Sequence, residues 1–217
     1  MKPINLIFIK LGGSLITNKE KAYVLRRNNI QKVAKSLSNI IREKKDTLFI
    51  IGNGAGSYGH FAATIRDYHK PFGFAFLQQK VKELNTIIVE ELLKNDIPAI
   101  TIPFSSVSTA KGGQLQTIYL ESLIGLLETG INPTIYGDVV YDSEENSTIF
   151  STEKIFSVLC EKLGSSYKIS KIIHLTTVDG LLNEDEKVIP LITQKNFGAI
   201  KKNLYKTKGF DVTGGMV

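Results

Sequence analysis

Short apolar segments alternate with amphipathic helical patterns along this chain, and this alternation limits the folds that it can adopt. Segments rich in β-branched and apolar residues, each too short for a helix, are Leu6 to Ile9, Thr47 to Ile51, Pro98 to Ile102, Thr134 to Tyr136 and Lys171 to Thr176. Apolar residues with i, i+3, i+4 spacing predict helices over residues 30–41, 84–92, 115–127 and 155–163. Apolar strands joined by helices favour a mostly parallel sheet covered on both faces. We therefore expect an α/β fold, a three-layer αβα sandwich with a mostly parallel central sheet.

The composition is that of a globular protein and excludes several other classes. The 217 residues are 42% hydrophobic and 22% charged, which excludes a disordered, collagenous or low-complexity chain. Lysine and arginine number 27 against 21 for aspartate and glutamate, and the net charge of +6 favours anionic partners without identifying one. The basic clusters do not alternate with aromatic residues, so we expect solvated surface and no nucleic-acid partner.

Two further features bear on the setting of the chain. No apolar run reaches the roughly eighteen residues that a membrane-spanning helix needs, and the first residues lack a targeting pattern, so we expect no membrane partner. The single cysteine, Cys160, lies in a helical pattern and is interpreted as a small buried hydrophobe that excludes an internal disulfide. These features favour a cytoplasmic protein.

Glycine-rich segments follow the predicted strands. Parallel sheets bind ligands beyond the carboxyl ends of their strands. At these places the chain has Lys10-Leu-Gly-Gly-Ser14, Gly52-Asn-Gly-Ala-Gly-Ser-Tyr-Gly-His60, Thr177-Val-Asp-Gly180 and Asp211-Val-Thr-Gly-Gly215. Glycine lets the backbone approach a ligand and aim successive N–H groups at an anion. The first two segments therefore predict two phosphate positions.

Two nucleotide-binding motifs can be tested against these segments. Gly54 to Gly59 matches the dinucleotide fingerprint, but that site needs a strand ending in an acid about twenty residues on, where Phe74 to Gln79 stands instead. Hydride transfer is therefore disfavoured. No glycine segment ends in Gly-Lys-Ser/Thr, which excludes a P-loop. Cationic side chains stand beside the anion-binding loops, at Lys10, Lys19 and His60. This pattern favours phosphoryl transfer, because that reaction depends on positioning and on electrostatic stabilisation of the transferred group.

Five motifs, taken in order, resemble those of the amino-acid kinase superfamily. They are Lys10-Leu-Gly-Gly-Ser14 with Thr17 and Lys19, Gly54-Ala-Gly-Ser-Tyr-Gly-His60, Gly137-Asp-Val-Val140, Thr177-Val-Asp-Gly180 and Asp211-Val-Thr-Gly-Gly-Met216. The pattern is most similar to the isopentenyl phosphate kinases, with His60 as the most discriminating residue, and the fosfomycin kinases are similar there. The resemblance implies the amino-acid kinase fold, a homodimer, and ATP-dependent phosphorylation of a small phosphate monoester, with isopentenyl phosphate becoming the diphosphate.

The resemblance also implies a role for each matching residue. The catalytic residues would be Lys10, Lys19, His60 and Glu153, with Lys10 between the donor and acceptor phosphates and His60 on the acceptor's phosphate. The acceptor would further contact Gly54, Ala55, Gly59 and Phe76, and an apolar tail pocket would include Phe72, Phe74 and Val81. ATP would contact Lys10, Gly12, Gly13, Ser14, Thr176, Thr177, Asp179, Gly180, Asp211, Thr213 and Gly214. The protein would supply no metal ligands, because Mg²⁺ would be held largely by the phosphates of ATP.

The chain departs from the family pattern at several places. Ser151-Thr-Glu153 stands where the family usually has Ser-Gly-Asp, so Glu153 carries the charge on a longer arm, and Asn53 and Ala55 replace residues that are commonly His and Gly. The family pattern continues past Met216 to a lysine that contacts ATP, so we expect either a truncated C-terminus or an incomplete nucleotide lobe. We expect a single domain over 1–217, with an acceptor lobe over about 1–135 and a nucleotide lobe over 136–217.

Structural interpretations compete with these functional ones. Glu153 fits equally well as a first-turn acid that stabilises its own helix. His69 and His174 lie in a turn-like stretch and an apolar strand, so both are interpreted as structural. The alternative functions keep the fold: a kinase for another acceptor, such as a fosfomycin-like phosphonate or a nucleoside monophosphate, or a non-catalytic nucleotide-binding protein.

Overall fold

The computed structural model of the chain describes residues 4–183 and 187–204. The chain divides into two compact units, one up to Leu175 and one from Thr176 onward. The boundary between acceptor and nucleotide lobes near residue 135 is defined by ligands and stays a prediction.

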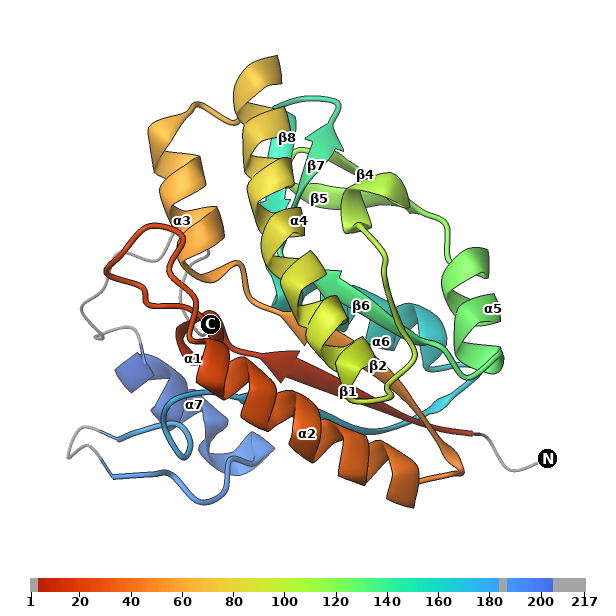
Figure 1. Cartoon of the computed structure of the whole chain (residues 1–217). Helices are drawn as coiled ribbons and strands as arrows, with labels where there is room; N and C mark the ends of the chain where they lie inside the picture. Colours follow the sequence, from red (N-terminus) through yellow and green to blue (C-terminus); the bar gives the residue numbers. More distant parts are fainter. Residues whose placement is uncertain (1–3, 184–186, 205–217) are drawn as a thin grey trace. The chain divides into compact units, whose positions relative to one another are not determined.

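A five-stranded parallel sheet forms the centre of the first unit (Figure 1). Its strands are β1 (Asn5–Leu11), β2 (Thr47–Asn53), β3 (Ala99–Thr101), β6 (Asn132–Tyr136) and β9 (Lys168–Leu175). They lie in the order β3-β6-β2-β1-β9, and every pair is parallel. All five apolar segments of the sequence therefore form strands of one sheet, although Thr176 lies beyond the end of β9.

Helices cover both faces of this sheet and produce the expected three layers. On one face, α2 (Arg27–Glu43) and α4 (Pro71–Lys94) bury Ile7 and Ile9 of β1. On the other face, α5 (Glu121–Glu128) and α6 (Thr152–Leu163) bury Leu6 and Phe8 of the same strand. Successive β1 side chains thus enter opposite cores, which explains why this strand is apolar along its whole length. Cys160 is partly buried on α6 against the second of these cores, close to the expected role.

A second sheet of four strands was not expected from the sequence. It contains β4 (Ser108–Lys111), β5 (Gln114–Ile118), β7 (Asp138–Asp142) and β8 (Asn146–Phe150) in the order β5-β4-β7-β8, and the 3₁₀ turn Phe104–Ser106 precedes it. The helix predicted over 115–127 is therefore wrong in its first part, because Leu115 and Ile118 belong to β5 and the helix begins at Glu121.

A tight turn explains why this segment forms a hairpin. Gly112 and Gly113 both have positive φ angles, 56° and 75°, which glycine adopts without strain. The Asp142 carboxylate accepts hydrogen bonds of 3.0 and 2.7 Å from their backbone N–H groups. The i, i+3 spacing of Leu115 and Ile118 favours a helix, although Gly112-Gly113 is a local turn signal that Asp142 of another strand then stabilises.

The remaining helices are short or lie in the second unit. Two follow strands at the carboxyl edge of the parallel sheet: α1 (Gly13–Ile16) after β1 and α3 (Gly56–Ile65) after β2. The second unit contains α7 (Gln194–Leu204) and a bridge between Leu182 and Val188. None of the helices within residues 4–183 and 187–204 is long and apolar enough to cross a membrane.

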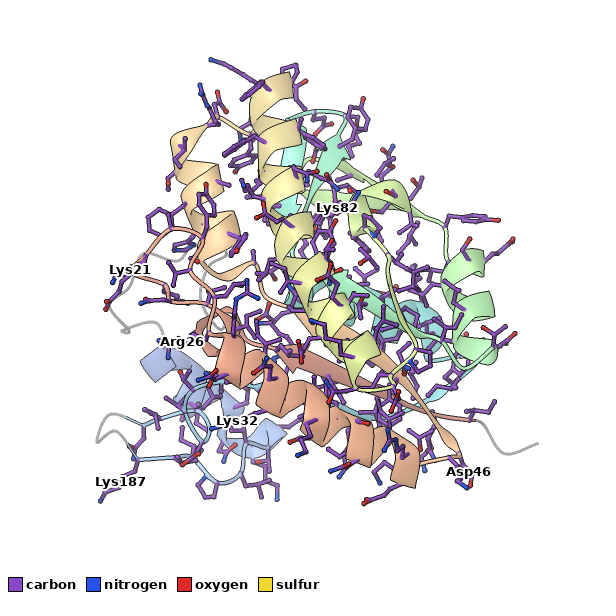
Figure 2. The ribbon with its side chains drawn as sticks, in the orientation of Figure 1. Lys21, Arg26, Lys32, Asp46, Lys82 and Lys187 are labelled. Atoms are coloured by element: carbon purple, nitrogen blue, oxygen red, sulfur yellow. The ribbon has the colours of Figure 1, made fainter. Side chains whose placement is uncertain are left out.

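The basic residues of the first unit lie largely at its surface, as expected. Figure 2 labels Lys21 on the segment after α1, Lys32 on α2 and Lys82 on α4. All three side chains are exposed.

Candidate functional site

The two glycine loops at the carboxyl edge of the sheet are in direct backbone contact. A Cβ built on Gly13 would lie 2.7 Å from Cα of Gly56, and one built on Gly54 would lie 2.9 Å from the Gly13 nitrogen. Real Cβ atoms do not approach other atoms so closely, so neither position tolerates a side chain without a shift of the backbone. The loops also extend the sheet, because Gly54 N–H donates to the Leu11 carbonyl over 2.9 Å and Gly12 N–H donates to the Leu175 carbonyl over 2.7 Å.

Thr17 fixes the two loops relative to each other. Its buried hydroxyl donates to the Gly13 carbonyl over 2.8 Å and accepts from the Ser57 N–H over 2.9 Å. This joins α1 to the start of α3. Gly56 completes the junction with a φ of +51°, and a Cβ there would lie 2.3 Å from the Thr17 hydroxyl. The N-terminal ends of both helices are therefore held side by side, where their first N–H groups have no partners within the helices.

Lys10 projects from the end of β1 toward α6. It pairs in register with Gly52 of β2, so the two residues point to the same face of the sheet. A Cβ at Gly52 would meet Cγ2 of Thr152 at 2.7 Å and the Phe156 ring at 2.8 Å, so this glycine lets the first turns of α6 rest directly on the sheet. The start of α6 thus lies beside the Lys10 side chain.

The Glu153 carboxylate in the first turn of α6 accepts a hydrogen bond from the Lys10 ammonium and forms an ion pair with it. The helix start is fixed from two sides: the Ser151 hydroxyl accepts from Lys154 N–H over 3.2 Å, and the Thr152 hydroxyl donates to the Asn53 carbonyl over 2.7 Å. Glu153 is therefore both a first-turn acid and the partner of Lys10, so the two interpretations of this residue are compatible.

Lys19 lies on an exposed loop after α1. Backbone bridging between Thr17 and Leu25 closes the loop. Tyr23 attaches it to the neighbouring helices, with its ring 5.4 Å from the Tyr58 ring of α3 and 4.9 Å from the Lys80 ammonium of α4. His60 is half-buried in α3. Lys19 and His60 thus belong to segments that adjoin the glycine loops, and their catalytic roles stay predictions.

The predicted acceptor residues surround the first turns of α3. Gly59 is in close contact with Ala55, because a Cβ at Gly59 would lie 2.4 Å from the Ala55 methyl and 3.2 Å from Val81 of α4. Phe74 and Phe76 pack against an apolar cluster of α3, α4, β6 and β7 residues, namely Ala62, Leu77, Val81, Tyr136 and Val139. Phe72 is 68% exposed and stacks on Phe76, so it lies outside this core. The tail pocket stays a prediction.

The predicted nucleotide residues lie largely in the second unit or beyond the described part of the chain. Thr176, Thr177 and Asp179 are exposed, and a Cβ at Gly180 would lie 2.8 Å from the Val188 side chain. Asp211, Thr213 and Gly214 fall outside the described residues. Gly12, Gly13 and Ser14 are half-buried at the start of α1 in the first unit.

Sequence reasoning did not find the contacts of two residues beside these loops, His174 and Asn53. His174 of β9, interpreted as structural, pairs in register with Lys10. Asn53 is buried and accepts a 2.7 Å hydrogen bond from Asn85, which in turn accepts one of 2.6 Å from Thr101. The signal for both is the order of the strands in the sheet, which a single sequence does not provide.

No three His, Cys, Asp or Glu side chains of residues 4–183 and 187–204 converge as metal ligands. Glu153, the acid at the glycine loops, is engaged by Lys10.

Comparisons with known proteins agree with this architecture. The model of the amino acid kinase family matches residues 5–217. An isopentenyl phosphate kinase of Methanocaldococcus jannaschii is 31% identical, over 97% of this chain and 84% of that protein. One from Arabidopsis thaliana is 25% identical, over 96% of this chain and 80% of that protein. A solved structure of an isopentenyl phosphate kinase superposes with a TM-score of 0.77 at 27% identity, covering 92% of this chain and 86% of that one.

Proposed function

Because this chain belongs to the amino acid kinase family, we propose that it is an ATP-dependent kinase whose acceptor is a small phosphate monoester, isopentenyl phosphate. The observation that carries the proposal is the contact between the two glycine loops beside the Lys10–Glu153 ion pair. Each loop can bind one phosphate through its backbone N–H groups. The Lys10 ammonium, fixed between the end of β1 and the start of α6, can neutralise charge on both phosphates. Relatives named as isopentenyl phosphate kinases, covering nearly the whole chain, support the choice of acceptor.

The reaction needs no nucleophile from the protein. An oxygen of the acceptor phosphate forms a bond to the γ-phosphorus of ATP, while the bond from that phosphorus to the β–γ bridging oxygen breaks and ADP leaves. Negative charge spreads over the oxygens of the transferred group, so positioned cations and N–H groups lower the barrier.

Lys10 is the residue that we assign to the transferred group. Lys10 lies near the carboxyl end of β1, two residues before Gly12, and only 12% of its side chain is exposed. Glu153 holds the Lys10 ammonium in one place, so the cation is oriented before substrates bind. We assign Glu153 as a positioning residue, because it acts through Lys10.

His60 is the residue that we assign to the phosphate already on the acceptor. It follows Gly59 in α3 and can donate a hydrogen bond in either protonation state. Backbone N–H groups at the start of α3 would bind the same phosphate, apart from that of Ser57, which donates to the Thr17 hydroxyl. Mg²⁺, when bound, would neutralise charge on the phosphates of ATP, which would also be its main ligands.

A panel of acceptors tests the proposal. Purified protein with Mg-ATP is offered isopentenyl phosphate, fosfomycin or uridine monophosphate, and ADP release is measured with each. We expect turnover with isopentenyl phosphate above the other two. Preference for another acceptor would keep the kinase and change its substrate, whereas ATP binding in calorimetry without any transfer would establish the non-catalytic alternative.

A variant of His60 tests the acceptor role within the same assay. In His60→Gln we expect KM for the acceptor to rise and KM for ATP to stay unchanged. The matched control is His69→Gln. His69 lies in the connection between α3 and α4, outside the proposed site, and its ring hydrogen-bonds the Glu145 backbone carbonyl at 2.9 Å. A homodimer stays a prediction from the resemblance, which analytical ultracentrifugation tests, and a cytoplasmic setting stays a prediction from the sequence composition and the first residues.

A further inference from the structure

His174 is the neighbour of Lys10 on β9. The two residues pair in register in adjacent parallel strands, so their side chains leave the same face of the sheet. On the other side of Lys10 the register partner is Gly52, which has no side chain. Lys10 therefore has a different neighbour on each side. On the β2 side the start of α6 fills the space over Gly52, and on the β9 side stands His174.

The charged groups that act on this imidazole come from two different elements. Lys10 of β1 disfavours the protonated ring, and Glu153 of α6 favours it. The His174 side chain is exposed, and β9 is the outermost strand of the sheet on its side of β1. His174 precedes Leu175, and the Leu175 backbone carbonyl accepts a hydrogen bond from the Gly12 N–H of the first glycine loop. The ring is thus accessible at the same strand ends as Lys10 and the loop.

We propose that His174 is a further phosphate-binding residue of this site, which contacts the terminal phosphate of a bound nucleoside triphosphate beside Lys10 and takes up a proton as that phosphate binds. The inference rests on the proposed function, because it needs the nucleotide to place its terminal phosphate at Lys10. The inference goes beyond the proposed function because it adds His174 to the nucleotide-binding residues and couples nucleotide binding to the uptake of a proton.

Electrostatics give the direction of this linkage. The part of the His174 ring that packs against the protein loses hydration, and this, followed by the Lys10 ammonium, lowers the pKa of His174 from its ordinary value, while Glu153 opposes the shift only in part. The free site therefore holds a neutral imidazole near neutral pH. A polyanionic phosphate placed against the Lys10 ammonium and the imidazole outweighs the repulsion from Lys10 and raises the pKa of the ring. Nucleotide affinity then increases as the pH falls through the pKa of the bound state.

Proton NMR of the imidazole rings tests this directly, because the chain has only three histidines, His60, His69 and His174. Each ring is assigned from its His→Gln variant, and the pKa of each is measured with and without a magnesium complex of a non-hydrolysable ATP analogue. We expect the pKa of His174 to rise on nucleotide binding by about one unit or more. The His69 ring serves as the internal control and should not move.

Calorimetry of the His174→Gln variant gives a second, independent readout. Glutamine keeps a hydrogen-bond donor but cannot be protonated. We expect it to weaken nucleotide binding about tenfold at a pH one unit below the ordinary imidazole pKa of about 6.5, and to have little effect one unit above it. Proton uptake on binding, measured in two buffers of different ionisation enthalpy, should be smaller in the variant than in the wild type.

The outcomes separate this inference from the proposed function. Failure of the wild-type protein to bind the nucleotide would overturn both. Normal nucleotide binding with an unmoved His174 pKa, or with equal loss of affinity at both pH values in His174→Gln, would overturn the role of His174 alone. A purely structural role would lower the melting temperature of the variant without changing its proton uptake, and it too would overturn the proposal. If the variant does not fold, the titration of the wild-type rings still decides.

Discussion

The Lys10 ammonium and the Glu153 carboxylate form an ion pair that joins residues 143 positions apart in the sequence. The pair links the carboxyl end of β1 to the first turn of α6, and it exists because Gly52 lets that helix rest on the sheet. The lysine is 12% exposed and the glutamate 39%, so the pair lies at the rim of the site, where a ligand can reach it. Glu153 thus reaches Lys10 from the position where the family pattern has a shorter aspartate.

Glu153→Gln tests the orienting role that we propose for this carboxylate. Glutamine keeps the shape and a hydrogen-bond acceptor but loses the charge that holds the ammonium, so we expect kcat to fall by about tenfold to a hundredfold with KM for ATP little changed. The matched control is Glu161→Gln on the same helix, because that side chain is 75% exposed and its carboxylate pairs with the adjacent Lys162. Equal kcat values in wild type and Glu153→Gln would remove Glu153 from the mechanism.

Gly13→Ala tests the backbone contact between the two loops. The added methyl would lie 2.7 Å from Cα of Gly56, and backbone atoms cannot move aside cheaply, so we expect a loss of about 1–3 kcal/mol in the free energy of unfolding. Urea denaturation measures it. Gly125→Ala in α5 is the control: beyond its chain neighbours and the backbone of its own helix, no atom lies within 4 Å of the position that its methyl would take, and alanine should stabilise that helix by up to about 1 kcal/mol. Equal effects of the two substitutions would contradict the close contact.

Asp138 makes stability depend on pH in a predictable direction. This buried carboxylate accepts 2.9 Å hydrogen bonds from Ser105 and Val139, yet burial raises its pKa to about 6. Between about pH 4 and pH 6 the folded state therefore binds more protons than the unfolded state, and stability falls as the pH rises through this window, by roughly 3 kcal/mol at most.

The comparison with Asp138→Asn isolates this contribution, because asparagine does not titrate. Urea denaturation of both proteins between pH 4 and pH 7 should show the wild type losing stability relative to the variant as the pH rises. Any loss caused by the poorer hydrogen bonding of asparagine is constant with pH and does not hide the trend. A difference that stays constant over the whole range would show that Asp138 is ionised at every pH tested.

Asn85→Leu tests the buried polar relay behind the second glycine loop. The substitution leaves the side-chain amide oxygen of Asn53 and the Thr101 hydroxyl without their present partner, so we expect a loss of about 2 kcal/mol or more in the free energy of unfolding. Thr86→Ala is the control, because its exposed hydroxyl bonds the Lys82 carbonyl of the same helix. A loss no larger than that of the control would mean that water replaces the relay.

The sequence predicts the layers of the fold better than it predicts the site. The five apolar strands and the helices around Ile30 and Leu84 follow from periodicity alone, because local patterns determine them. The β4–β5 hairpin was missed because the helical spacing of Leu115 and Ile118 was followed, although Gly112-Gly113 is a local turn signal that Asp142 of another strand then stabilises. The sequence identified Lys10 and Glu153 individually, from motifs, but could not place His174 beside Lys10, since that needs the pairing of β1 with β9.

The most direct test of the proposed activity is transfer from Mg-ATP to isopentenyl phosphate by the wild-type protein and by Lys10→Met, followed by phosphorus NMR. Methionine keeps much of the length of the side chain without its charge. We expect isopentenyl diphosphate and ADP from the wild type, and a kcat lower by about a hundredfold to a thousandfold in a variant that still folds. Equal rates in the two proteins, or no diphosphate from a wild type that binds both substrates, would contradict the assignment of this site as a phosphoryl-transfer centre.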